Sequence, residues 1–390
     1  MVKKFYIALK LLGINNGTLV DIIKLIPEKQ VKNLLSGEYF NLQYKYNIDL
    51  SKYHDVLNNN KLITEKIKEA EEIIRVSKEL EIKVVIINSR FYPNNLKSVD
   101  NPPAILYLKG KNFTKKDEKA IACVGTRQPT EFGTRAVSSI VESLVKENFI
   151  IVSGLAMGID AESHCTCLKS QGRTVAVLAH GLDTIYPKEN KGLMEDILKS
   201  GGTLISEYPV KTRPDKFRFV ERNRIISGLS KGVVVFEAKS KSGTMHTVNF
   251  AIEQKRKVFC PIPVRKDIQS SGLTDLLFEK KAIGIKSKDD YDTILKELGF
   301  TVMNDVKKIM QAKNKSINEI YSSCNITMDT LDDIIKLSYD KKSGITVNRE
   351  IYDIFKQILS DNNLSVKEFF NTIIVNVVSG HKDKGGSSDE

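Results

Sequence analysis

Between residues 120 and 260 the chain alternates short apolar runs with segments of helical length, and this alternation restricts its fold more than any other feature. The apolar runs cover residues 121–124, 149–152, 174–178, 232–236 and 257–259. Helical patterns cover residues 137–146, 161–170 and 247–254. Near-continuous apolar strands separated by helices predict an α/β fold with a parallel sheet that is covered on both faces.

Glycine-containing segments suited to binding phosphate follow three of these strands. Glycine lets backbone N–H groups approach a phosphate closely, and the N-terminus of a following helix adds partial positive charge. Ligands of such sheets bind outside the carboxyl ends of the strands. The candidate phosphate-binding residues in these segments are Gly125, Thr126, Arg127, Ser153, Gly154, Gly158, Ser242, Gly243 and Thr244.

A basic stretch from residue 211 to residue 224 interleaves cationic side chains with Phe217 and Phe219. Its candidate phosphate-binding residues are Lys211, Arg213, Arg218, Arg222, Asn223 and Arg224. A solvated loop is the ordinary meaning of such a run, whereas the aromatic residues favour DNA because bases stack on aromatic faces. The two phenylalanines equally fit anchors that hold the loop to the core, so both interpretations stay open.

The net charge favours an acidic partner. The 390 residues include 60 Lys and Arg against 48 Asp and Glu, a formal charge of +12, and nucleic acid is the commonest acidic partner. No apolar run is long enough to span a bilayer, and the N-terminus lacks the cleavage pattern of a signal peptide. Five cysteines without a framework spacing favour a reduced compartment. We therefore expect a cytoplasmic protein without a membrane partner.

Catalytic, metal and cofactor motifs are weak. Cys165 and Cys167 do not have the spacing of a zinc-ligand pair, and the histidines are scattered. The chain contains no GxSxG, GxxxxGK[ST] or GxGxxG motif. Asp160 fits a helix-capping residue and His164 a hydrogen-bonded core histidine, while Glu237 fits either a ligand contact or a loop-ordering group. We expect no metal, no cofactor and no catalytic residue.

An ordered set of motifs resembles one known family. It comprises Gly125-Thr126-Arg127, the segment SGLAMGID with His164, GLDTIYPKEN, Ser206-Glu207, ERNRIISGLS, Glu237 and SGTMHT. Together these segments resemble the DNA-processing protein A family, also called DprA or Smf, over residues 84–297. Family members often carry Ser at the position of Thr126, which keeps the hydroxyl group.

The resemblance implies an extended Rossmann-like domain after a small helical domain. It implies a non-enzymatic homodimer that binds single-stranded DNA and helps to load a RecA-type recombinase onto strands taken up in transformation. Arg127 and the loop from Ser153 to Gly158 are then expected to line the DNA pocket. Arg222, Asn223 and Arg224 are expected to lie close to it.

The predicted domain order follows from these patterns. We expect a helical N-terminal domain at residues 1–82, the extended Rossmann-like DNA-binding domain at 83–300, and a helical connector at 301–340. Residues 341–380 form a strand–helix–helix pattern that resembles a ribbon–helix–helix module for dimerisation or DNA binding, and residues 381–390 a disordered tail. Many family members instead end in a winged-helix-like domain.

Two other functions remain open. Rossmann-like enzymes that hydrolyse the glycosidic bond of nucleoside monophosphates use a glycine-threonine loop with a glutamate, which Glu237 and the segment from Ser242 to Thr244 partly match. Free base and ribose phosphate would be their products. Alternatively, the C-terminal module binds duplex DNA, with Thr346 and Asn348 facing the major groove, and the chain is a regulator.

Overall fold

The computed structural model describes residues 2–263, 267–286 and 290–300. Its compact units are Met1–Tyr291 and Asp292–Glu390. The described part of the second unit is short and carries most of helix α13 (Tyr291–Glu297). The predicted connector, the strand–helix–helix module and the tail lie outside the described residues, so these three predictions, with Thr346 and Asn348, remain predictions.

The first unit begins with a helical segment, as its sequence pattern predicts. Its helices are α1 (Lys3–Leu11), α2 (Asn16–Leu25), η1 (Glu28–Leu35), α3 (Tyr39–Tyr46), η2 (Ser51–Tyr53), α4 (His54–Leu57) and α5 (Asn60–Glu79). Asparagine caps start two of them: Asn15 accepts a hydrogen bond from the Thr18 N–H, and Asn59 accepts one from the Leu62 N–H. The helices bury apolar side chains such as Ile7 and Leu19.

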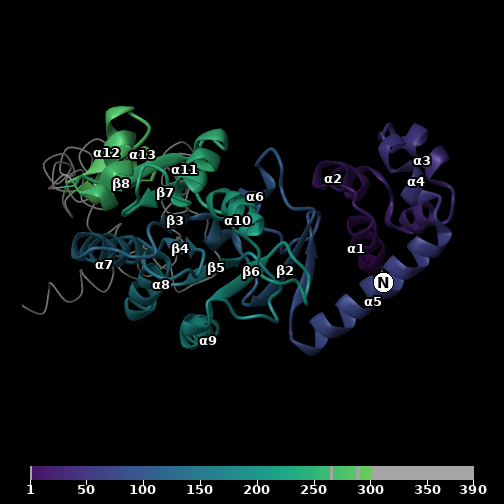
Figure 1. The fold of residues 1–390 in the computed structure, drawn as a ribbon, viewed down its shortest axis with the longest axis horizontal. Helices are drawn as coiled ribbons and strands as arrows, with labels where there is room; N and C mark the ends of the chain where they lie inside the picture. Colours follow the sequence, from purple (N-terminus) through teal and green to yellow (C-terminus); the bar gives the residue numbers. More distant parts are fainter. Residues whose placement is uncertain (1, 264–266, 287–289, 301–390) are drawn as a thin grey trace, which may run out of the picture. The chain divides into compact units, whose positions relative to one another are not determined.

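A mostly parallel sheet follows (Figure 1). Its order is β1-β2-β6-β5-β4-β3-β7-β8-β9. The parallel strands are β3 (Ala120–Val124), β4 (Ile150–Ser153), β5 (Thr174–Leu178), β6 (Thr203–Ser206), β7 (Gly232–Val235), β8 (Lys257–Pro261) and β9 (Ile283–Ile285). Strands β3 to β7 are buried along their whole length, which explains why their sequences are mainly apolar.

An antiparallel pair extends one edge of the sheet. Strand β1 (Lys83–Ile86) pairs with β2 (Ile105–Gly110), and β2 pairs with β6. Short helices α6 (Asn94–Lys97) and η3 (Lys115–Glu118) occupy the connections before β3.

The chain order of the strands creates a switch point. From β3 the chain proceeds through β4 and β5 to β6, and it then returns to β7 on the other side of β3. Right-handed crossovers consequently place α7 (Glu131–Lys146), α8 (Ile159–Lys169) and α9 (Lys191–Lys199) on one face of the sheet. They place α10 (Lys216–Gly228), α11 (Thr244–Glu253) and α12 (Ser271–Phe278) on the other face (Figure 1). Between β3 and β7 lies the position where such folds bind ligands.

Some elements differ from the sequence pattern. Residues 216–228 form helix α10, which the basic and aromatic sequence does not predict, and Asp215 caps this helix by accepting a hydrogen bond from the Phe217 N–H. Strands β6 and β9 were not predicted.

None of the helices in the described part is long and apolar enough to cross a membrane. The described cysteines, Cys123, Cys165, Cys167 and Cys260, are free thiols.

Candidate nucleic-acid interface

A groove of about 350 Å³ opens at the carboxyl ends of β3 and β7. It lies at the switch point of the sheet, so the fold and the glycine pattern point to the same place. Several of the predicted phosphate-binding residues line it. They are Gly125, Thr126, Arg127, Arg222, Asn223, Ser242, Gly243 and Thr244.

Glu237 fixes the loop that carries Arg127. Its backbone oxygen accepts a hydrogen bond from the Thr126 N–H at 2.7 Å. Its fully buried carboxylate accepts bonds from the Thr130 N–H at 2.7 Å and the Thr130 hydroxyl at 2.8 Å, at the start of α7. Both ends of the loop are thus tied to one residue, and Arg127 between them is exposed. Of the two roles open for Glu237, the structure has it as a loop-ordering group.

The glycine-rich loop after β4 packs directly on the Arg127 loop. The Ile159 N–H donates to the Thr126 carbonyl at 3.1 Å. Gly158 has φ of +79°, and a Cβ atom there would lie 2.5 Å from the Thr126 oxygen and 2.6 Å from the Arg127 carbonyl. Only glycine fits this backbone conformation and this approach. Gly158 therefore allows the two loops to pack closely together, although it does not itself line the groove.

Arg222 is a buried side chain that holds the same glycine-rich loop. Its guanidinium donates to the Gly154 carbonyl at 2.8 Å and also to the Val177 carbonyl. A Cβ atom on Gly154 would lie 2.7 Å from the guanidinium carbon, so the glycine provides the space for it. Arg222 lines the groove, but its hydrogen bonds run to two backbone carbonyls and to the Asn223 side-chain oxygen, at 3.2 Å, within the protein.

The charge of Arg222 is balanced by Asp160 at the start of α8. Burial lowers the pKa of Arg222 to about 10, so it remains protonated at neutral pH, and Asp160 acts in the opposite direction. Burial raises the pKa of Asp160, while the Arg222 charge lowers it. The Asp160 carboxylate accepts hydrogen bonds from the Gly154 and Ala156 N–H groups. Asp160 therefore has a structural role, but it is not the helix cap that its position predicted: its bonds run to the preceding loop, and α8 starts after Gly158 without a side-chain cap.

Phe219 lies between two arginines. The guanidinium carbons of Arg127 and Arg222 are 5.8 and 5.7 Å from its ring centroid, within cation–π range. This contact links the fixed Arg222 to the exposed Arg127. Phe217 is different, because 82% of it is exposed. The two phenylalanines that the sequence could not separate therefore have distinct surroundings.

The start of α11 forms the opposite wall. The Thr244 hydroxyl donates to the Gly125 carbonyl at 3.0 Å, which joins this wall to the Arg127 loop. The Ser242 hydroxyl oxygen is buried and has no hydrogen-bond partner in the described part of the chain. A helix N-terminus beside it contributes partial positive charge to the groove.

The remaining candidates lie outside the groove lining. Ser153 is fully buried and donates to the Cys123 carbonyl at 2.6 Å. Arg224 forms a largely buried ion pair with Glu207 and donates to the Asn101 carbonyl at 2.9 Å. Arg224 is thus held between β6 and the connection before β2, not in the groove.

The first part of the basic stretch is more exposed. The Lys211 ammonium lies 3.2 Å from Glu72 of helix α5. Arg213 is exposed, and its carbonyl accepts a hydrogen bond from Arg218 at 2.6 Å. Lys211, Arg213 and Arg218 do not line the groove.

His164 belongs to the core. It is fully buried, its Nδ1 lies 2.6 Å from the Thr174 hydroxyl, and burial lowers its pKa to about 3. This matches the core histidine that its position predicted. The described residues also contain no cluster of His, Cys, Asp and Glu that could hold a metal ion.

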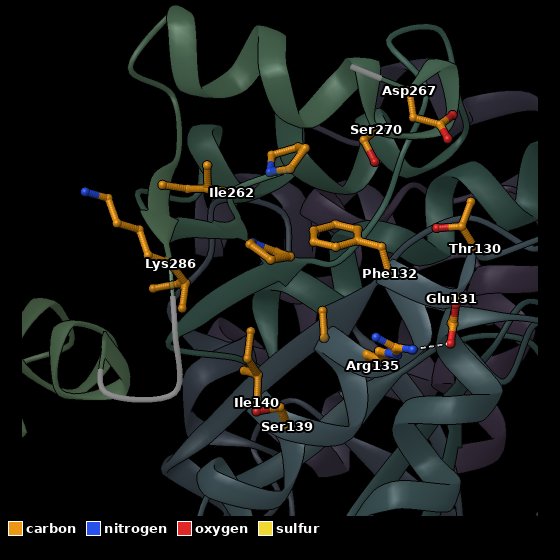
Figure 2. A pocket seen from close by; sticks show the side chains of 14 residues that line it. Thr130, Glu131, Phe132, Arg135, Ser139, Ile140, Ile262, Asp267, Ser270 and Lys286 are labelled. Atoms are coloured by element: carbon orange, nitrogen blue, oxygen red, sulfur yellow. Dashed lines mark hydrogen bonds and ion pairs between the residues drawn. The ribbon is translucent and has the colours of Figure 1, made fainter. Parts of the chain in front are cut away.

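A larger cavity, of about 580 Å³, lies elsewhere in the first unit. The cavity is lined by Phe132, Arg135 and Ile140 of α7 and by Ile262 and Lys286, and Figure 2 shows the Arg135 guanidinium directed to Glu131, with which it pairs. None of the predicted phosphate-binding residues lines this cavity. The larger of these two cavities is therefore not the place that the glycine pattern identifies. Of the two, the groove is the one that lies at the switch point and is lined by Arg127 and Arg222.

The chain matches the family model described as DNA recombination-mediator protein A over residues 83–298. It is 43% identical to the DNA processing protein DprA of Bacillus subtilis over 187 residues, which is 48% of this chain and 63% of that protein. The matched part thus spans less than two thirds of that relative.

Solved structures of DNA processing protein A resemble this one. DNA processing protein A from Streptococcus pneumoniae superposes with a TM-score of 0.58 and 30% identity, over 73% of this chain and 94% of the other. The Helicobacter pylori protein, solved to explain its single-stranded DNA binding mode, superposes with a TM-score of 0.50 and 29% identity. That match covers 56% of this chain and 97% of the other.

Proposed function

Because this chain belongs to the DNA recombination-mediator protein A family, we propose that it binds single-stranded DNA in the groove between β3 and β7. One observation carries the proposal: the exposed Arg127 stands on a loop whose two ends are fixed by Glu237, opposite the N-terminus of α11. Such a site is preorganised for an anion, so binding a phosphate does not require the loop to be ordered first.

Each wall has a distinct part in the proposed binding. Arg127 pairs with a backbone phosphate through its forked guanidinium, and backbone N–H groups near Gly243 hydrogen-bond to the same strand. Lys211, Arg213 and Arg218 attract the phosphates of a strand that extends beyond the groove. Arg222 and Gly154 support the walls. The +12 charge of the chain favours the encounter.

We further propose the finer role that the resemblance implies. The chain acts by holding DNA and not by catalysis, as a homodimer that helps a RecA-type recombinase to load onto the strand. The family model described as DNA recombination-mediator protein A and the relatives named DNA processing protein support a role in DNA recombination.

The test compares single-stranded and duplex oligonucleotides of equal length by fluorescence anisotropy with the full chain. We expect the single strand to bind about tenfold or more tightly than the duplex, since each base that stacks on the protein adds about 1–3 kcal/mol. Tighter binding of one duplex sequence than of any single strand would instead favour the duplex-binding regulator. Release of free base from nucleoside monophosphates would favour the hydrolase.

A further inference from the structure

The loop between β5 and α9 is hydrogen-bonded both to the glycine-rich loop after β4 and to the start of the basic stretch. The buried Asn190 amide donates to the Leu155 carbonyl in the glycine-rich loop at 2.9 Å. The Asp183 carboxylate accepts a hydrogen bond from the Lys211 N–H at 2.9 Å, at the start of the basic stretch. The Gly181 N–H donates to the Thr212 carbonyl at 3.0 Å. These bonds hold residues 181–190 in place without any ligand.

Tyr186 presents its ring from this fastened loop. Its centroid is 5.5 Å from that of Phe219, with 50° between the ring planes, and 43% of the residue is exposed. Phe219 in turn contacts the guanidinium of Arg127. The exposed tyrosine ring thus lies one aromatic ring away from the proposed phosphate-binding arginine.

Phe219, Phe217 and Tyr186 differ in how well their surroundings would allow a base to stack on the ring. The guanidinium groups of Arg127 and Arg222 both lie against Phe219, which limits the room for a base on that ring. Neither Phe217 nor Tyr186 lines the groove itself, but Tyr186 packs on Phe219, the ring that contacts Arg127. Tyr186 combines an exposed ring, a fixed loop and the neighbouring cation.

We propose that Tyr186 is a stacking face for an unpaired nucleobase of the strand whose phosphate is held by Arg127. This proposal rests on the proposed function and adds the source of its selectivity. Phosphate contacts occur equally with single strands and duplexes, whereas a base inside a duplex is already stacked and paired. A stacking face beside the phosphate site therefore favours single strands, and it accepts any base because every base has a π-face.

The first test replaces Tyr186 by alanine and by phenylalanine in the full chain. We expect Tyr186→Ala to weaken binding of a single-stranded oligonucleotide about 5- to 100-fold, the range for loss of one base–aromatic stack. Tyr186→Phe keeps the ring and is expected to bind within about twofold of the wild type. Duplex affinity and the dependence of affinity on salt should stay unchanged in both variants, because stacking releases no counterions.

A second test uses the DNA as a partner in a double-mutant cycle. Single abasic sites are placed along the oligonucleotide, and each is measured against the wild type and Tyr186→Ala. At the position that stacks on Tyr186, removal of the base should weaken the wild type strongly and the variant little. Equal losses in both proteins at every position would overturn the stacking role.

The outcomes also separate the two proposals. A wild-type chain that binds single strands, with Tyr186→Ala binding them equally well, refutes the stacking role and leaves the proposed function intact. A wild-type chain that binds no single strand refutes both. A Tyr186→Ala variant that loses single-strand and duplex binding alike, while Tyr186→Phe keeps both, would show that the ring shapes the groove and stacks no base.

Discussion

Replacing Arg222 by alanine is expected to lower the free energy of unfolding by about 3–5 kcal/mol, because it leaves buried carbonyl groups without donors and removes the positive charge that acts on the buried Asp160. The carbonyl groups are those of Gly154 and Val177. Denaturant unfolding of the full chain measures the effect. Arg222→Lys should lose less, because it keeps the charge but lacks the guanidinium fork.

Arg218→Ala is the matched control for this prediction. Arg218 lies one turn earlier on α10, is partly exposed, and donates to the Arg213 carbonyl near the surface. Its removal should change the free energy of unfolding by no more than about 0.5 kcal/mol. Equal destabilisation by Arg222→Ala and Arg218→Ala would contradict the supporting role of Arg222.

Gly158→Ala is expected to destabilise the protein by about 2–6 kcal/mol. About 1–3 kcal/mol comes from the positive φ, which alanine tolerates poorly, and a similar amount from steric overlap. The overlap is with the backbone of Thr126 and Arg127, which cannot rotate away as a side chain would. The loop that carries Arg127 must therefore move, and thermal unfolding together with single-strand affinity should register both effects.

Gly243→Ala is the matched control, because it makes the same chemical change in the groove lining at the start of α11. Gly243 has φ of −59°, and no atom lies within 4 Å of a Cβ placed there. We expect its stability to stay within about 0.5 kcal/mol of the wild type. A Gly158→Ala protein as stable as Gly243→Ala would show that the two loops are not packed as described.

The sequence predicted five of the parallel strands, β3, β4, β5, β7 and β8, because these strands are mostly buried and carry long apolar runs, whereas β6 and β9 are short and carry Thr, Ser or Gly. Strands such as β3 and β7 consist of uninterrupted apolar residues, which few other structures produce. Helix α10 was missed for the opposite reason. It buries Arg222 among polar and aromatic neighbours, so its sequence lacks the apolar periodicity that marks a helix.

The sequence predicted which types of residue form the site, but it did not predict which residues contact one another. Gly125, Arg127 and Gly243 were recognised because glycine and arginine after strand ends suit phosphate, and they line the groove. Arg224 shows the limit of this reasoning, since its partner Glu207 is separated from it by a turn and part of a helix. No local pattern reveals that an arginine is already paired.

Tyr186 and Glu237 are residues whose importance the local sequence pattern did not reveal. Tyr186 was noted only as part of a motif, because exposure depends on the packing of three loops. Glu237 was placed at a strand end, but the residue that it fastens, Thr130, is more than a hundred positions away in sequence. Such distant pairs follow from the fold, once strand order brings β3 and β7 together.

The central claim is that the groove at Arg127 holds a single strand by its phosphates, and one measurement tests it most directly. The affinity of Arg127→Ala for a single-stranded oligonucleotide is measured over a salt series beside the wild type and Arg135→Ala. Arg135 carries the same charge on α7 but pairs with Glu131 outside the groove. We predict that Arg127→Ala binds about 10- to 150-fold more weakly and that its slope of log affinity against log salt falls by about 0.7. Arg135→Ala should match the wild type, and an Arg127→Ala variant with unchanged affinity and slope would contradict the account.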